Sequence, residues 1–479
     1  MKLSSNSLKN AHFKFNMFSK STSKKKPNLI EDPIMQLFIR IAVPSSIGTV
    51  FMTLYNVVDT YFAGKISAEA LAALAQTFPL YFIIIALGVG LSIGTTSLIA
   101  NALGEKKTKK ASYYLAQSII LAIIASVIVS LIGINLGPSI ILIMNDSFVT
   151  MRLSMDYLNI IFLGSIFVFI QMTVNSSLSA IGDTKSNRNV LIVSFFLNIV
   201  LNPLFIFGYG FIPAMGIKGI AFSTIVSQAL GTVYIIYKAT KIELGKYLYL
   251  NCFKPKIKIL IDLLKQGVPA SIGMMMISVG IFIILFFIGQ YGDLALAGYG
   301  TAIRYEQLYL LPVLGLNTAV LSMVGQNFGA KQLNRVKEIY NKAILFGCTF
   351  MFFSGFIIYF SAETAVSFFT DNKEVIKYGT TYLQITALME PIYPIFFISN
   401  ALIQGLKKAN VVMYLTLGRM VVLPIIVLWY LIFYLESSFE FVFWGLLIIN
   451  WLYGIFVLLF SINLLKRQTQ NISLAKSSV

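Results

Sequence analysis

Long apolar segments alternate with short polar loops along almost the whole chain. A helix needs roughly 20 consecutive apolar residues to cross a bilayer. Apolar segments of this kind lie at 80–100, 119–136, 157–174, 190–208, 277–288, 343–360 and 443–465. When spans interrupted by glycine or proline are included, the pattern predicts about twelve membrane-spanning helices.

The composition agrees with a protein that crosses the membrane many times. Hydrophobic residues make up 57% of the 479 residues and charged residues only 12%, whereas a soluble domain carries about 25% charged residues. The net charge of +18 could indicate a nucleic-acid partner, but its placement argues against one. Lysine and arginine gather in alternate loops, near residues 20–26, 106–110, 185–188, 254–258, 331–337, 407–408 and 466–467.

This alternation follows the positive-inside rule, under which cytoplasmic loops carry the excess of lysine and arginine. The intervening loops are nearly free of these residues, with a few exceptions such as Lys65 and Arg152. The pattern predicts an even number of spans and two cytoplasmic termini. We therefore expect a multi-pass protein of the plasma (inner) membrane, in contact with the lipid bilayer and not with nucleic acid.

The sequence offers few residues for a metal or cofactor site. The two cysteines, Cys252 and Cys348, form no motif, and the single histidine, His12, lies in the polar N-terminal segment. We therefore expect no disulfide framework, no histidine-based metal site and no bound cofactor. No acid–base–nucleophile set indicates an enzyme. Residues 1–30 lack the apolar region of a signal peptide and are expected to form a disordered cytoplasmic tail.

The two halves of the chain repeat one pattern. The stretch VPSSIG at 43–48 returns as VPASIG at 268–273, an offset of 225 residues. The same offset, held without a gap, pairs Gly90 with Gly315 and Gly104 with Gly329. Each half therefore holds about six helices, and both halves have the same orientation because an even number of spans returns the chain to the cytoplasm.

We expect an all-α membrane protein in which two pseudo-symmetric six-helix lobes surround a central cavity. The predicted lobes cover 31–240 and 258–465, a cytoplasmic linker covers 241–257, and a second cytoplasmic tail covers 466–479. Repeats of this type are typical of secondary transporters, with a binding site between the halves. Channels and membrane enzymes also contain repeats, so the repeat alone leaves these classes open.

Asp59 is the first candidate for a functional residue. A charged side chain at the centre of a bilayer costs roughly 2.5–3.5 kcal/mol, so it is kept there for a reason. Asp59 lies late in the first span, is still followed by Tyr61 and Phe62, and shares a helical face with Asn56, three residues earlier. The simpler alternative is a hydrated carboxylate near the outer end of the helix.

The fifth span supplies possible partners for this carboxylate. Its stretch FLNIVLNP places Asn198 and Asn202 four residues apart on one face, followed by Pro203. A proline frees a backbone carbonyl one turn earlier in its helix. Amide oxygens, a freed carbonyl and one carboxylate could form a Na⁺ or proton site. Hydrogen bonding between helices is the structural alternative.

The second half contains four further ionisable residues within spans, Arg304, Glu306, Glu390 and Arg419. Arg304 and Glu306 are two residues apart, so they point to different faces of their helix. Each therefore needs a partner elsewhere or a water-filled cavity. An arginine–glutamate pair between helices is the simpler interpretation, and contact with a substrate is the alternative.

Methionine and proline residues add candidates for pocket flexibility. The stretch GMMMIS at 273–278 places Met275 among three consecutive methionines. Flexible, polarisable methionine suits a promiscuous apolar pocket, although ordinary packing accounts for most methionines. Pro44 and several other prolines lie within spans, where each can bend its helix.

Several motifs together resemble the multidrug and toxic compound extrusion (MATE) family, in its bacterial and archaeal cation-coupled type. The resemblance covers roughly residues 34–465 and is carried by YNVVDTYFAG, SLIANALGE, AIGDTK, LNIVLNPLFIFG, GIKGIAFSTIVSQ and MVGQNFGA. It implies twelve helices in two lobes that form an outward-opening V. It also implies multidrug efflux by antiport, in which cationic or amphipathic organic compounds leave as H⁺ or Na⁺ enters.

The resemblance assigns roles to individual residues. It implies that Asp59 is the cation-coupling residue, that Asn198 and Thr224 belong to the same site, and that Pro44 is the bending point of the first helix. Many members carry a second aspartate where this chain has Asn202. An amide can still ligate Na⁺ through its oxygen but cannot titrate, so H⁺ and Na⁺ both remain open as the coupling ion.

We therefore expect a secondary active antiporter that acts as a monomer on small organic substrates. The candidates for its cavity are Tyr55, Asn56, Met275, Arg304, Glu306 and Glu390. A lipid-linked oligosaccharide flippase of the same superfamily is the alternative, and it would need a strongly cationic cavity for pyrophosphate. A membrane scaffold, a third possibility, would need no carboxylate within a span.

Overall fold

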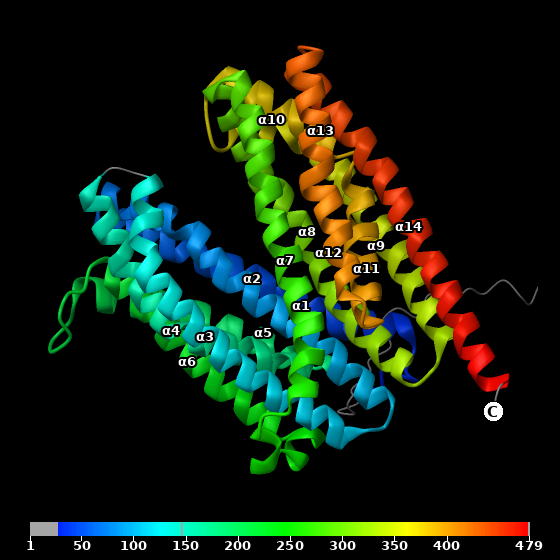
Figure 1. The fold of residues 1–479 in the computed structure, drawn as a ribbon. Coiled ribbons are helices and arrows are strands. Elements are labelled where there is room, and N and C mark those ends of the chain that lie inside the picture. The colour runs from blue at the N-terminus through cyan, green and yellow to red at the C-terminus, as the bar shows by residue number, and fades with distance from the viewer. Residues whose placement is uncertain (1–26, 145–146, 478–479) are drawn as a thin grey trace, which may run out of the picture.

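The computed structural model describes residues 27–144 and 147–477, and helices dominate them (Figure 1). The N-terminal half forms α1 (Ile34–Ile66), α2 (Ala68–Gly104), α3 (Thr108–Met144), α4 (Phe148–Ala180), α5 (Lys185–Phe207) and α6 (Ile217–Thr240). The C-terminal half forms α7 (Ile257–Ile288), α8 (Asp293–Gly329), α9 (Leu333–Ser367), α10 (Lys373–Thr386), α11 (Tyr393–Gly405), α12 (Ala409–Leu417), α13 (Leu423–Trp429) and α14 (Phe439–Ser477).

Short helical turns complete the chain. The predicted linker contains η1 (Glu243–Tyr247) and η2 (Leu250–Phe253), and η3 (Gly289–Tyr291) follows α7. A further turn, η4 (Glu390–Ile392), separates α10 from α11. The helix that contains α12 and α13 widens at η5 (Gly418–Val422) and η6 (Tyr430–Tyr434), where the backbone adopts π geometry.

The number of spans agrees with the prediction of about twelve. Within the described ranges, 11 helices are long and apolar enough to cross a membrane, or up to 12 if a bent pair counts as one span. That pair consists of α10 and the segment Glu390–Gly405, which meet at an angle of 46°. Pro391 lies at the start of the second segment and lacks the N–H that a continuous helix would use.

The repeat in the sequence is also a repeat in the packing. A Cβ atom built on Gly90 of α2 would lie 2.1 Å from Oγ of Ser271 in α7. A Cβ atom built on Gly315 of α8 would lie 2.1 Å from Oγ of Ser46 in α1. Both pairs are related by the offset of 225 residues, so each glycine-bearing helix crosses tightly against a helix of the other half.

The two lobes meet at the end of the molecule that carries the basic loops, hereafter the basic end. Asn101 of α2 donates through Nδ2 to the carbonyl of Gly405 at 2.9 Å. Its counterpart in the repeat, Gln326 of α8, donates through Nε2 to the carbonyl of Ala180 at 2.7 Å. Figure 1 shows the lobes diverging from this end like the arms of a V.

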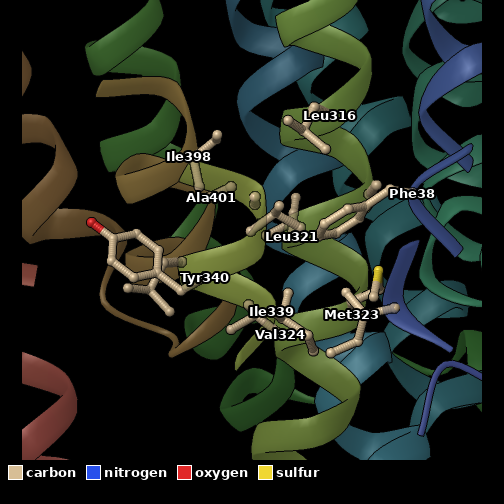
Figure 2. Close-up of a cluster of buried hydrophobic side chains, with 14 of the residues drawn as sticks. Phe38, Leu316, Leu321, Met323, Val324, Ile339, Tyr340, Ile398 and Ala401 are labelled. Carbon is tan, nitrogen blue, oxygen red and sulfur yellow. The ribbon is translucent and has the colours of Figure 1, made fainter. Parts of the chain in front are cut away.

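An apolar cluster strengthens the joint between the lobes. Phe38 of α1, Leu321 of α8, Ile339 of α9 and Ile398 of α11 all belong to it and are almost completely buried (Figure 2). Each contact between such side chains contributes little, but a buried side chain makes dozens of them. The first helix of one half is therefore fixed to three helices of the other.

The structure moves the boundaries predicted for the two tails. Residues 1–26 of the predicted N-terminal tail lie outside the described residues. Leu29, however, is 1% exposed, and Asn327 donates through Nδ2 to its carbonyl at 2.9 Å. Residues 27–30 therefore belong to the folded part and not to a tail. At the other end, α14 continues to Ser477, so the predicted second tail is helical over most of its length.

Candidate functional site

A central cavity of about 430 Å³ lies between the lobes. Tyr55 and Asn56 of α1 line it, as predicted. Met274 of α7 lines it in place of the predicted Met275, its neighbour in the chain. Arg304 does not belong to its wall and is exposed, so the prediction that Arg304 faces this cavity is wrong.

Asp59 lies at the centre of a buried polar cluster in the N-terminal lobe. Its side chain is 6% exposed. Asn198 and Asn202 each donate through Nδ2 to Oδ1 of Asp59 at 2.9 Å. Thr224 donates through Oγ1 to Oδ2 at 3.3 Å. The structure thus brings together all four residues predicted for cation coupling, from three different helices.

The local sequence explains this geometry. Asn198 and Asn202 are four residues apart in α5, so both side chains lie on the face that meets α1. Their remaining amide atoms are also paired, because Asn202 donates to Oδ1 of Asn198 at 3.1 Å and Ser223 of α6 donates to Oδ1 of Asn202. Ser223 is not among the residues predicted from the sequence, although its position next to Thr224 is a usable signal.

The cluster stabilises a negative charge in the membrane by donating hydrogen bonds to it. A hydrogen bond to a charged group contributes about 1.5–3 kcal/mol, which offsets part of the cost of burying a carboxylate. The two amides present N–H groups to Asp59, and their oxygens are used elsewhere. A bound Na⁺ would require oxygen ligands, so both amides would have to rotate before they could coordinate it. A proton requires no such change.

Pro44 lies inside α1, and the first helix can bend at this position. It is buried and sits 15 residues before Asp59, about 22 Å along a helix. Because proline has no N–H, the backbone carbonyl four residues earlier in the helix receives no hydrogen bond from it. A bend at Pro44 would therefore move Asp59 relative to α5.

A second cavity, of about 240 Å³, lies within the C-terminal lobe. Glu306 of α8 lines it and is 3% exposed. Tyr393 donates its hydroxyl to Oε1 of Glu306 at 3.0 Å, and Tyr382 donates to Oε2. These two tyrosines belong to no recognisable motif, so the sequence does not predict them as partners of Glu306.

Arg419 faces the same cavity. Its guanidinium carbon lies 3.6 Å from the centre of the Phe396 ring, and its Nε donates to Oδ1 of Asn450 at 3.2 Å. Glu306 interacts with it electrostatically, yet among the described residues no ion pair within 4.0 Å joins Arg419 to a glutamate. The simple arginine–glutamate pair expected from the sequence is therefore not formed.

Glu390 differs from the expectation that it contacts the cavity directly. It lies in η4, is 0% exposed and is not part of the cavity wall. Over the described part of the chain, neither of its carboxyl oxygens has a hydrogen-bond partner. It is close enough to Glu306 for the two carboxyl groups to interact electrostatically.

Comparison with known sequences identifies relatives of the chain. The model of the MatE family matches residues 44–204 and 269–430, one match in each lobe. The multidrug export protein MepA of Staphylococcus aureus (strain MSSA476) is 25% identical over 422 residues, which cover 87% of this chain and 91% of MepA. The probable multidrug resistance protein YoeA of Bacillus subtilis (strain 168) is 27% identical over 370 residues, which cover 76% of this chain and 78% of YoeA.

Solved structures share the fold. A crystal structure of MATE in complex with MaL6 has a TM-score of 0.86 at 24% identity and covers 94% of this chain and 100% of that chain. A MOP superfamily transporter from Pyrococcus furiosus has a TM-score of 0.85 at 24% identity and covers 93% of this chain and 99% of that chain. These similarities establish the architecture of two lobes around a cavity.

Proposed function

Because the chain belongs to the MatE family of multidrug transporters, we propose that it is an antiporter that exports organic cationic or amphipathic compounds in exchange for protons. The observation that carries this proposal is the single carboxylate of Asp59, buried in the first lobe and surrounded by three donors. Its neighbours along α1, Tyr55 and Asn56, line the central cavity. A change in the charge of Asp59 that moves α1 can therefore also move residues of the cavity wall.

In the proposed cycle, Asp59 alternates between two charge states. Ionised, it accepts the hydrogen bonds of Asn198 and Asn202, which hold α1 against α5. A proton on the carboxyl removes the charge and weakens these charge-assisted bonds. The first helix is then free to bend at Pro44, which reshapes the cavity and releases the compound. The membrane potential contributes about 2.3 kcal/mol per charge per 100 mV to this exchange.

The donor geometry favours H⁺ over Na⁺ as the coupling ion. In the structure, both amides present nitrogen to Asp59, and the oxygen of each accepts a hydrogen bond from another side chain. Asn202 also replaces the second aspartate of many members, which leaves one anionic ligand in the cluster. A Na⁺ site usually gathers several oxygen ligands, whereas protonation needs only the carboxyl group itself.

The test is transport by purified protein in liposomes, with a pH gradient or a Na⁺ gradient imposed separately and ethidium as the cationic probe. We expect the pH gradient alone to drive ethidium transport. We expect Asp59→Asn, which keeps the shape of the side chain but cannot release a proton, to lose gradient-driven transport while it still binds ethidium. Full transport by this variant would refute the coupling role, and transport driven by Na⁺ alone would assign the site to Na⁺.

The flippase alternative lacks support from the cavity walls. Such a protein would need several cations to bind pyrophosphate, and in the wall of the central cavity Arg188 is the one cationic residue. Arg304 is exposed and contributes nothing there.

We also propose that the protein acts as a monomer in the plasma membrane, with both termini cytoplasmic. The basic loops support this orientation, because the positive-inside rule places them in the cytoplasm. A membrane-impermeant maleimide applied to intact cells should fail to label a cysteine introduced at Lys407, and it should label one introduced at Tyr209, an exposed residue in the opposite loop after α5. The reverse labelling would contradict the proposed orientation.

A further inference from the structure

The cavity of the C-terminal lobe combines one positive and one negative side chain within an aromatic wall. Arg419 and Glu306 both line it, together with the rings of Tyr299, Phe396 and Phe443. In a site for simple cations, a guanidinium would repel the ligand. In a site for anions, a buried carboxylate would repel the ligand. The arrangement therefore matches a ligand that carries both charges.

Arg419 is oriented so that most of its donors remain available. It lies in the widened turn η5, and π geometry of this kind occurs frequently at functional sites. Tyr453 donates its hydroxyl to the carbonyl of Leu415 at 2.9 Å, one turn before Arg419. Across the described residues, Nε is the one guanidinium nitrogen that donates a hydrogen bond, to Asn450. The terminal nitrogens form the fork that binds a carboxylate in bidentate fashion.

Glu306 is oriented as the opposite pole. The hydroxyls of Tyr382 and Tyr393 each occupy one of its oxygens. A carboxylate oxygen has two lone pairs, so each can accept a further hydrogen bond from a ligand. Glu390, fully buried behind it, adds a second carboxyl group without a hydrogen-bond partner in the described residues. This pole is therefore suited to a cationic group of a ligand.

The size and position of the cavity define how such a ligand would lie. Its volume of about 240 Å³ is below the roughly 300–1,000 Å³ of most drug sites. It shares wall residues with the central cavity, namely Ile277, Phe397, Asn400 and Thr416. A drug-sized compound can therefore place its charged end in the C-terminal lobe and extend into the space between the lobes.

From these observations we propose that the C-terminal lobe contains a subsite for zwitterionic aromatic compounds. The carboxylate of the compound binds Arg419, its cationic group binds Glu306, and its ring system packs against the aromatic wall of the cavity. This inference rests on the proposed export function and defines one class of its substrates. It also gives Arg419 a role that the proton site in the other lobe does not supply.

The experiment compares rhodamine B, which carries a carboxylate and a cationic amine system, with its ethyl ester, which lacks the carboxylate. Binding of each dye to the purified protein is measured by fluorescence polarisation, and export is measured in liposomes. A hydrogen bond to a charged group contributes about 1.5–3 kcal/mol, so its loss should weaken binding about tenfold or more. We expect Arg419→Gln to weaken rhodamine B by this factor and the ester by less than about threefold.

Two further variants separate a ligand contact from a structural role. Asn450→Asp keeps Arg419 but places a carboxylate beside it, so it should compete with the carboxylate of rhodamine B and leave the ester unaffected. Glu306→Gln should weaken both dyes, because both carry the cationic group. Thermal unfolding of each variant shows whether the protein is folded. If Arg419→Gln does not fold, Asn450→Asp still decides the matter.

The outcomes distinguish this proposal from the export function itself. A selective loss of rhodamine B in Arg419→Gln or Asn450→Asp supports the subsite. An equal loss of both dyes, or no loss of either, overturns it. Export of the ester by these variants shows that antiport is intact, whereas a wild-type protein that exports neither dye and no ethidium would contradict the export function and not only the subsite.

Discussion

The polar cluster of the N-terminal lobe consists of the Asp59 carboxylate and the side chains that donate hydrogen bonds around it. Asn202 is 0% exposed and takes part in three contacts, with Asp59, Asn198 and Ser223. Amides in membrane helices often serve only to join helices. Here the amides face a carboxylate, so their first effect is to make a buried charge tolerable.

The importance of these donors can be tested by Asn202→Leu. This change keeps the number and branching of the side-chain heavy atoms but removes a donor to Asp59, and a buried group left without its partner costs about 1–3 kcal/mol. We expect a lower midpoint of thermal unfolding and slower proton-driven transport. Asn135→Ala is the matched control, because Asn135 is exposed and its amide bonds only to its own helix. Equal stability of the two variants would contradict this account.

At this scale the sequence predicted the polar cluster around Asp59 well and the surroundings of Glu306 poorly. Asp59 and its amide partners were recognisable because polar residues stand out in apolar spans. The partners of Glu306 are tyrosines, which occur throughout membrane helices and carry no signal of their own. Arg304 and Glu306 were equally conspicuous, yet only the helix orientation in the fold separates the exposed residue from the buried one.

Helices of the two halves approach each other through glycines. At Gly90 and Gly315 a side chain of any size would collide with a serine of the facing helix. Small residues at helix crossings allow the backbones to approach closely, which is a common way to join helices in membranes. The crossings of α2 with α7 and of α8 with α1 therefore depend on the absence of a Cβ atom.

Gly90→Ala and Gly315→Ala should both destabilise the protein. Each adds one methyl group within 2.1 Å of a serine oxygen, and overpacking of this kind costs about 1–3 kcal/mol. Gly300→Ala, also in α8, is the control, because a Cβ atom there meets nothing within 4 Å. Thermal unfolding should show a loss for the first two variants and no loss for the control. A destabilised control would attribute the effect to the helix backbone and not to the crossing.

Helix positions followed closely from the hydrophobic pattern, whereas interruptions of helices did not. The break at Glu390 and the widened turn at Arg419 both lie inside apolar segments. A proline such as Pro391 shows where a helix can bend but does not fix the angle. Packing against the neighbouring helices determines whether the helix bends and by how much. The residues that set this packing are spread over the whole lobe.

The whole molecule is held closed at its basic end by contacts between the lobes. Glu105, directly after α2, lies 3.7 Å from Lys407, directly after α11, and 2.9 Å from Lys107. Partial burial opposes ionisation of Glu105, but Lys107, Lys110 and Lys407 outweigh it and hold the pKa of its carboxyl below the usual value. The contact therefore links the two lobes through a carboxylate that stays ionised at neutral pH.

This arrangement predicts how Glu105→Gln depends on pH. Since the pKa of Glu105 is lowered in the folded state, its contribution to stability is complete above the ordinary glutamate pKa. The contribution is lost as the pH falls through the lowered pKa. The stability difference between wild type and Glu105→Gln should thus be constant across the neutral range and vanish in acid. Solvent screening limits it to about 1 kcal/mol or less. A difference that grew in acid would contradict the assignment.

The packing repeat does not extend to the buried carboxylate of the N-terminal lobe. The offset of 225 residues that relates the two glycine crossings pairs Asp59 with Ile284, which lines the cavity of the C-terminal lobe. Under the proposals made above, two copies of one scaffold have separate roles, ion coupling in the N-terminal lobe and substrate selection in the C-terminal lobe. A hybrid of two relatives joined at the linker would then take its substrates from one parent and its coupling ion from the other.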